Sequence, residues 1–232
     1  MRQIIAIGGG GFGREIKELK IEKYIVDQSD KTNPSICFIP TATGDDAQYI
    51  ENFYKAFDSL NCKTSHIDFF KRTINLENHI SDQDIIFVGG GNTKSMLAVW
   101  RDWELDKILH KAYMKGTIMS GVSAGAICWF ERGITDSWAS ELKVLDCLGL
   151  LKGTCCPHYD GEENRRPSVE AFLKNKTLEE CLCIEDGAAA HFENGSFKTA
   201  ISFFKSKNKN VYDVKFKENL IEKPYESINI FK

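Results

Sequence analysis

Short apolar runs alternate with longer amphipathic segments through the first half of the chain. The apolar runs predict strands at Ile4–Ile7, Ile36–Pro40, Thr64–Phe69, Ile85–Val88 and Thr117–Met119. The segments between them predict helices near residues 13–20, over Ala47–Leu60, and between the last two of these strands. Strands and helices that alternate at this spacing are typical of parallel strands joined by crossover helices. We therefore predict an α/β fold with a mostly parallel sheet and helices on both faces.

After Gly133 the alternation of apolar runs and amphipathic segments becomes less regular. Apolar runs predict further strands at Gly153–Cys156, Leu182–Ile184 and Thr199–Phe204, and residues 211–230 predict late strands or an edge hairpin. The chain has no internal repeat, low-complexity tract or Pro/Gly-rich linker, and its 232 residues suit one core. We therefore predict a single α/β domain that spans residues 1–232.

Composition narrows the class of protein further. The chain is 42% hydrophobic and 27% charged, as in soluble globular proteins, and its net charge of −3 gives no reason to expect a nucleic-acid or membrane partner. Most of the eight cysteines lie in apolar runs, none forms a CxxC pair and no signal peptide is apparent, so we expect reduced thiols and a cytoplasmic protein. The five histidines lack metal-ligand spacing. We expect neither a metal nor a cofactor, and we leave a homodimer open.

Three glycine-bearing segments fall at the ends of predicted strands. They are Gly8–Gly13, Gly89–Asn92 and Gly121–Gly125. Functional loops of such sheets lie at the carboxyl ends of the strands, so we expect these three segments to converge on one pocket.

The third segment places a serine where its hydroxyl can act as a nucleophile. The sequence GVSAGA at Gly121–Ala126 follows an apolar run and precedes residues of helical character, which is the order of a nucleophile elbow. Ser123 would be the nucleophile, and the backbone N–H of Ala124 would be an oxyanion donor. The bare GxSxG pattern also occurs in ordinary strand-to-helix turns, so it does not decide the function alone.

The first segment, Gly8–Gly13, could also be interpreted as part of a dinucleotide-binding site. Gly8, Gly10 and Gly13 satisfy the GxGxxG pattern of dinucleotide-binding folds. That site needs an acidic residue at the end of the second strand, where this chain has Pro40 followed by Thr41. A glycine turn that permits close backbone approach is the better interpretation.

A serine nucleophile needs a base, and His158 is the best candidate. It lies just past an apolar strand and after a proline, again at a strand end. The other histidines have less suitable contexts: His66 lies within a predicted strand, His79 and His110 in polar or helical segments, and His191 beside a turn where we expect it to be solvated.

The orienting acid would be Glu185 or Asp186, which follow the strand Leu182–Ile184. Adjacent residues point to different sides, so only one of the two reaches the imidazole. The chain order of serine, histidine and acid differs from that of α/β-hydrolases and chymotrypsin-like enzymes. It matches the nucleophile–histidine–acid order of class I glutamine amidotransferase-like folds, and a serine at the elbow favours a peptidase over a glutaminase.

Three motifs together resemble the peptidase E (aspartyl dipeptidase) family, which is related to the cyanophycinases. They are VGGGNT at Val88–Thr93, GVSAGA at Gly121–Ala126 and PHY at Pro157–Tyr159. The resemblance implies a cytosolic serine exopeptidase with a flavodoxin-like or glutaminase-like α/β core.

The resemblance also assigns roles to individual residues. Ser123 matches the nucleophile and His158 the base, and the family's acid falls on Asp186, with Glu185 and Asp136 as second choices. Gly90 or Gly91 would supply a second oxyanion donor beside Ala124. Asn92 and Arg165 would bind substrate, with Arg165 holding an acidic side chain; the alternative is that Arg165 belongs to a solvated charged loop.

We therefore expect a serine dipeptidase that cleaves short peptides through an acyl-enzyme, with N-terminal aspartate as one candidate specificity. The alternative is a non-catalytic or differently specific small-molecule binding protein of the same fold. The interpretation as a nucleotide-dependent enzyme is the least favoured of the three.

Overall fold

The computed structural model describes residues 1–13, 18–72, 75–138, 140–204 and 209–230. The larger of its two sheets contains β1 (Gln3–Ile7), β2 (Ser35–Ile39), β3 (Lys63–His66), β4 (Ile85–Val88), β5 (Ile118–Val122), β10 (Ala188–Glu193), β11 (Ser196–Ser202) and β14 (Ser227–Asn229). Their order across the sheet is β14-β11-β10-β1-β5-β4-β2-β3. The strands from β1 to β3 in this order pair in parallel, and β10 pairs antiparallel with β1. The mostly parallel α/β sheet predicted from the sequence is confirmed.

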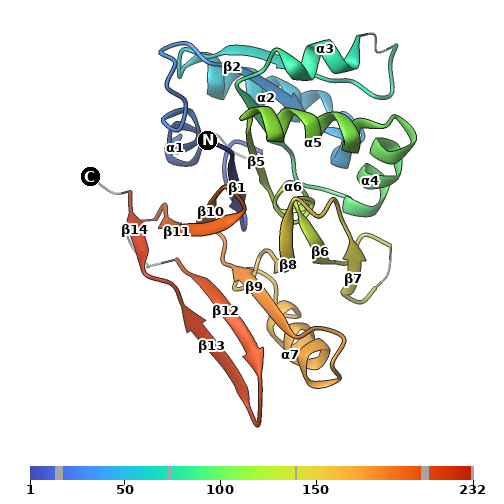
Figure 1. Cartoon of the computed structure of the whole chain (residues 1–232), viewed down its shortest axis with the longest axis vertical. Helices are drawn as coiled ribbons and strands as arrows, with labels where there is room; N and C mark the ends of the chain where they lie inside the picture. The colour runs from blue at the N-terminus through green and yellow to red at the C-terminus, as the bar shows by residue number, and fades with distance from the viewer. Residues whose placement is uncertain (14–17, 73–74, 139, 205–208, 231–232) are drawn as a thin grey trace.

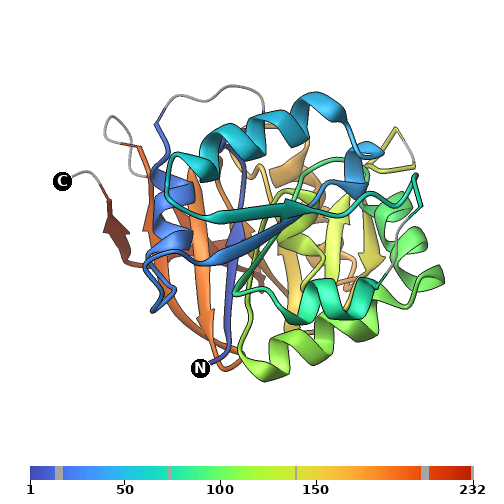
Figure 2. The same cartoon turned by 90° about the horizontal axis from the view of Figure 1, so that it is seen from above.

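Helices cover both faces of this sheet (Figure 2). One face packs against α1 (Lys20–Val26) and α2 (Ala47–Asp58), and the other against α3 (Leu76–Ser81), α4 (Thr93–Asp102) and α5 (Leu105–Lys115). Successive side chains of a strand point to opposite faces, so alternate residues of β1 enter the two hydrophobic clusters. Because both faces of the central strands are buried, these strands appear in the sequence as continuous apolar runs.

The first helix begins later than the sequence predicts. α1 starts at Lys20 rather than near residue 13, and part of the predicted range lies outside the described residues. The glycine loop has positive φ angles at Gly10 and Gly11 and then directs Phe12 into a cluster of aromatic rings. The Phe12 N–H donates to the buried carboxylate of Glu22, at 2.8 Å. Burial of Phe12 therefore fixes a turn at Phe12 and Gly13, at the start of the range in which a helix was expected.

A second, smaller sheet was not foreseen as a separate layer. It contains β6 (Phe130–Thr135), β7 (Lys143–Asp146), β8 (Leu151–Cys156), β9 (Glu180–Ile184), β12 (Val211–Phe216) and β13 (Leu220–Pro224). Their order is β13-β12-β9-β8-β6-β7, and β8 pairs in parallel with both β6 and β9 (Figure 1). One face packs into the cluster formed with α3–α5, and α7 (Arg165–Lys174) covers the other. β12 and β13 form the predicted hairpin.

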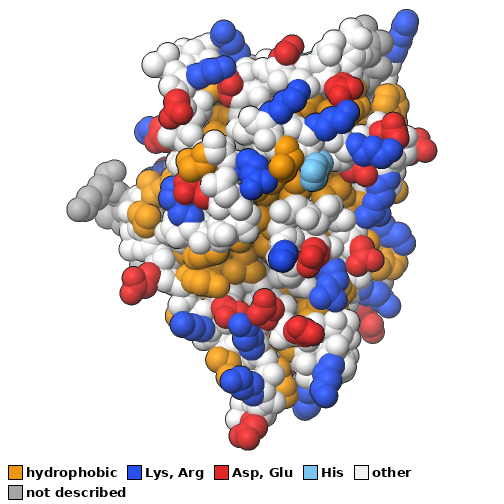
Figure 3. Space-filling view, in the orientation of Figure 1, with side chains coloured by type: hydrophobic (Ala, Val, Ile, Leu, Met, Phe, Trp, Pro, Cys, Tyr) orange, Lys and Arg blue, Asp and Glu red, His pale blue; other side chains and the backbone are white. Residues whose placement is uncertain are grey.

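The surface carries both signs of charge. Figure 3 shows lysine, arginine, aspartate and glutamate side chains interspersed over the face drawn. Among the described residues, no helix is long and apolar enough to cross a membrane.

Candidate active site

Ser123 occupies a strained turn between β5 and α6 (Ala124–Ile127). Its φ of 56° and ψ of −110° are unusual for a residue other than glycine. A Cβ on Gly121 would lie 2.3 Å from the Gly125 carbonyl oxygen, and a Cβ on Gly125 would lie 2.1 Å from that of Val88. Both glycines are therefore required for the strand to turn this sharply, and the predicted strand–turn–helix order is present.

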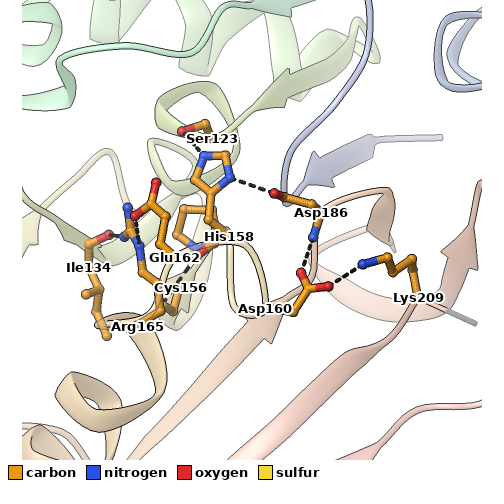
Figure 4. A network of polar contacts seen from close by, with 10 residues as sticks. Ser123, Ile134, Cys156, His158, Asp160, Glu162, Arg165, Asp186 and Lys209 are labelled. Carbon is orange, nitrogen blue, oxygen red and sulfur yellow. Dashed lines mark hydrogen bonds and ion pairs between the residues drawn. The ribbon is translucent and has the colours of Figure 1, made fainter. Parts of the chain in front are cut away.

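His158 lies between the serine hydroxyl and a carboxylate (Figure 4). Its Nε2 is 2.8 Å from Ser123 Oγ, and its Nδ1 is 2.6 Å from Asp186 Oδ1. The residue follows β8 after Pro157 and also has a positive φ, of 53°. The structure therefore brings Ser123, His158 and Asp186 into one hydrogen-bonded chain.

The neighbouring carboxylate, Glu185, has different partners. Its oxygens accept from the Asn210 N–H at 2.9 Å and from the Tyr212 hydroxyl at 3.2 Å, and Arg166 lies 3.5 Å away. Glu185 directly follows β9 and is buried beside the start of β12. Asp136, the other second choice, is exposed just after β6. Of the three carboxylates, Asp186 is the one hydrogen-bonded to His158.

The first glycine loop closes against this carboxylate. A Cβ on Gly9 would lie 2.0 Å from Asp186 Oδ1 and 2.8 Å from His158 Nδ1. On the other side, a Cβ on Gly161 would lie 2.2 Å from Asp186 Oδ2. The Gly187 N–H also donates to the Gly9 carbonyl at 2.8 Å. Close approach to Asp186 therefore accounts for Gly9 without a bound nucleotide.

The second glycine loop lies beside the nucleophile. A Cβ on Gly90 would lie 3.3 Å from Ser123 Cβ, and Gly91 has a φ of 136°. The Gly90 N–H donates to the Tyr49 hydroxyl at 3.4 Å. Ala124 is the first residue of α6, so its N–H has no acceptor within that helix.

These loops enclose a cavity of about 660 Å³. All three residues of the hydrogen-bonded chain line it, together with Gly90, Gly91 and Tyr49. Burial raises the pKa of the Tyr49 phenol, so its hydroxyl is protonated at neutral pH. The glycine segments predicted to converge on one pocket therefore do so.

The profile of peptidase family S51 matches residues 4–200. The chain belongs to peptidase family S51. It is 48% identical over 203 residues to the uncharacterized peptidase YgaJ of Bacillus subtilis, a match that covers 87% of this chain and 88% of that protein. The resemblance to the peptidase E family is confirmed, and the chain is a peptidase.

Solved structures share the fold of this S51 peptidase. A peptidase from an acI-B1 Actinobacterium superposes with a TM-score of 0.72 at 16% identity, over 96% of this chain and 95% of that one. A protein of Listeria monocytogenes EGD-e, provisionally named as a peptidase E, superposes with a TM-score of 0.65 at 18% identity, over 85% of this chain and 97% of that one.

The two residues expected to bind substrate lie outside the lining of this cavity in the S51 peptidase. The Arg165 side chain is buried, with Nε 2.7 Å from Glu162 Oε2 and a terminal nitrogen 2.8 Å from the Ile134 carbonyl oxygen (Figure 4). Asn92 caps α4 by accepting from the Ser95 N–H at 2.9 Å, and its amide group donates to the Ser137 carbonyl at 2.7 Å. Both side chains are therefore engaged in contacts within the protein.

His191 is not solvated, contrary to the prediction. It is 0% exposed on β10, where Nδ1 lies 2.7 Å from the Tyr24 hydroxyl and Nε2 lies 3.0 Å from Gln3 Oε1. Burial lowers the pKa of His191 to about 4, with Lys198 adding to the effect. The prediction failed because β10, which pairs along the whole of β1, was not recognised as a strand.

Three residues that sequence reasoning missed surround the site. Tyr49 lines the cavity from α2, and Asp160 and Lys209 join the hydrogen-bonded chain behind Asp186 (Figure 4). Asp160 is two residues from His158, which is the only local indication of its role. Lys209 lies between predicted strands, so its position follows only from the fold.

Proposed function

We propose that this chain is a serine exopeptidase that cleaves short peptides through an acyl-enzyme. The observation that carries the proposal is the continuous chain of hydrogen bonds from Ser123 Oγ through His158 to Asp186, on the wall of a cavity. A cavity of this volume lies within the range of about 300–1,000 Å³ typical of small-molecule sites, which favours a short peptide over an extended chain.

In this mechanism, Ser123 Oγ attacks the peptide carbonyl carbon while its proton passes to His158 Nε2. Asp186 accepts from the other ring nitrogen, which holds the imidazole in the required tautomer and stabilises its charged form. The N–H groups of Ala124 and Gly91 donate to the oxyanion; the N–H of Gly90 is already engaged by Tyr49. When the C–N bond breaks, His158 gives its proton to the leaving amine, and water then releases the acyl group by the same steps.

N-terminal aspartate remains one candidate specificity. The pairing of Arg165 with Glu162 does not support a direct role for this guanidinium in holding an acidic side chain. Of the described residues, the charged ones that line the cavity are Asp46, Glu162 and Asp186. A dipeptide panel with acidic, neutral and basic N-terminal residues will define the preference.

The proposal is tested with Ser123→Ala on that panel. We expect kcat/KM to fall by at least about 10³-fold, because the nucleophile is lost while the fold is kept. Ser120→Ala is the matched control: it removes a hydroxyl from β5, the strand that leads into Ser123, where Ser120 Oγ donates to the Ile86 carbonyl at 2.8 Å. Equal turnover by wild type and Ser123→Ala would refute the proposal.

A further inference from the structure

A charged pair lies directly behind the carboxylate that contacts His158. Asp160 Oδ1 accepts the backbone N–H of Asp186 at 2.9 Å, and its other oxygen forms an ion pair with Lys209 Nζ (Figure 4). The Asp160 side chain is 25% exposed and that of Lys209 is 19% exposed, so the pair is more shielded than an ordinary surface salt bridge.

The pair connects three loops that are far apart in the sequence. Asp160 follows β8, Asp186 follows β9, and Lys209 precedes β12. The backbone of Lys209 is itself held, because its N–H donates to Ser202 Oγ at 3.0 Å at the end of β11. A bond to the N–H of Asp186 restrains the main chain that carries the carboxylate, at the point where the chain turns through Gly187.

The charges of Asp160 and Lys209 also affect the balance between the neutral and protonated forms of the His158 imidazole. Asp160 brings a second carboxylate close to Asp186, and an uncompensated negative charge there would favour the protonated form of His158. Lys209 cancels that charge. The arrangement therefore restrains the geometry of Asp186 without changing the net charge around the base.

We propose that Asp160 and Lys209 are positioning residues that hold the backbone of Asp186 against His158 while keeping their own charges balanced. This inference rests on the proposed serine mechanism. It assigns a role in catalysis to two residues that are not among those lining the cavity.

The variants separate geometry from charge. Asp160→Ala removes the acceptor for the Asp186 N–H, and we expect kcat to fall about 10-fold or more with KM changed less than about 2-fold. Asp160→Asn keeps an acceptor oxygen but leaves Lys209 unbalanced. Lys209→Met keeps the acceptor but leaves the carboxylate unbalanced.

The two charge variants should move the pH profile in opposite directions. The base must be neutral to act, so an unbalanced carboxylate in Lys209→Met should move the acid limb of kcat/KM to higher pH, by roughly half to one pH unit. The unbalanced ammonium in Asp160→Asn should move it to lower pH by a similar amount. In the double variant that carries both Asp160→Asn and Lys209→Met, the acid limb should lie at the same pH as in the wild type. The other titratable groups that line the cavity, Asp46, Tyr49 and Glu162, are the same in every variant.

The experiment measures the rate of fluorophosphonate labelling against pH beside dipeptide turnover, in proteins whose folding is checked by circular dichroism. Lys215→Met is the matched control, because Lys215 pairs with Glu180 at 2.9 Å at the opposite end of β9. Unchanged kcat in Asp160→Ala, or acid limbs that coincide in the two charge variants, would overturn the inference. Failure of the proposed function is distinguishable, because wild type and Ser123→Ala would then label alike.

Discussion

At the scale of single residues, the site depends on backbone conformations that are costly for ordinary amino acids. Ser123 and His158 both have φ values above 50°, and residues held in such sparsely populated regions cluster at active sites. Hydrogen bonds compensate for this strain, because the Ser123 N–H donates to the Ile7 carbonyl at 3.0 Å and the His158 N–H to that of Gly8 at 3.3 Å. The backbone of β1 and the loop after it therefore hold both the nucleophile and the base in place.

Gly9→Ala tests whether the first glycine loop serves the hydrogen-bonded chain. The added methyl would occupy the space of Asp186 Oδ1, so we expect the carboxylate to be displaced and kcat/KM to fall about 100-fold. Gly44→Ala is the control, because its Cβ would meet nothing within 4 Å. An alanine at a φ of 69° should lower the free energy of unfolding by about 1 kcal/mol and leave the activity unchanged. Both variants are assayed on the best dipeptide, with soluble yield and melting temperature as checks. Unchanged turnover in Gly9→Ala would contradict this role.

At the scale of elements, apolar runs revealed the central strands but not β6 and β10. β4 was predicted to the residue and β2 to within one, because both are buried on each face. β6, with the sequence FERGIT, exposes Glu131 and was not predicted as a strand. β10 begins with three alanines, which have low strand propensity, so nothing in the local sequence marked it.

His191 connects β10, β1 and α1, and its burial predicts a pH dependence of stability. The unfolded chain binds a proton near the ordinary pKa of about 6.5, whereas the folded protein binds it only near 4. Between these values the unfolded state holds more protons, so the free energy of unfolding falls as the pH falls. We expect His191 to contribute about 2–3 kcal/mol of this loss between pH 7 and 4.5.

Urea denaturation at pH 7 and 4.5 measures that contribution against His191→Gln. Glutamine keeps a donor and an acceptor for Tyr24 and Gln3 but takes up no proton. The variant should therefore be less stable than wild type at pH 7 and lose less stability on acidification. Parallel losses in the two proteins would show that His191 does not titrate in this range.

At the scale of the whole molecule, the site lies where the two sheets meet. Ser123 follows β5 of the larger sheet, whereas His158 and Asp186 follow β8 and β9 of the smaller one. Strand ends and chain order selected Ser123 and His158 from the sequence but left Glu185 and Asp186 both open as the acid, and only the resemblance to the peptidase E family favoured Asp186. The existence of the second sheet was not predictable in this way, because local pattern does not show which strands from distant parts of the chain pair with one another.

The same limit explains why the contacts that Arg165 and Asn92 make within the protein were not predicted. The burial of Arg165 depends on the Ile134 carbonyl of β6, a strand that the sequence did not reveal. The contact of Asn92 with Ser137 likewise depends on the loop after β6. Side chains whose partners come from unpredicted elements cannot be assigned from local pattern alone.

Mass spectrometry of the fluorophosphonate-treated protein tests the central claim most directly. If Ser123 is the nucleophile that His158 and Asp186 activate, the intact mass should increase by one adduct, peptide mapping should place it on Ser123, and Ser123→Ala should remain unmodified under the same conditions. An adduct on another residue, or none in a wild-type protein that cleaves dipeptides, would contradict the account.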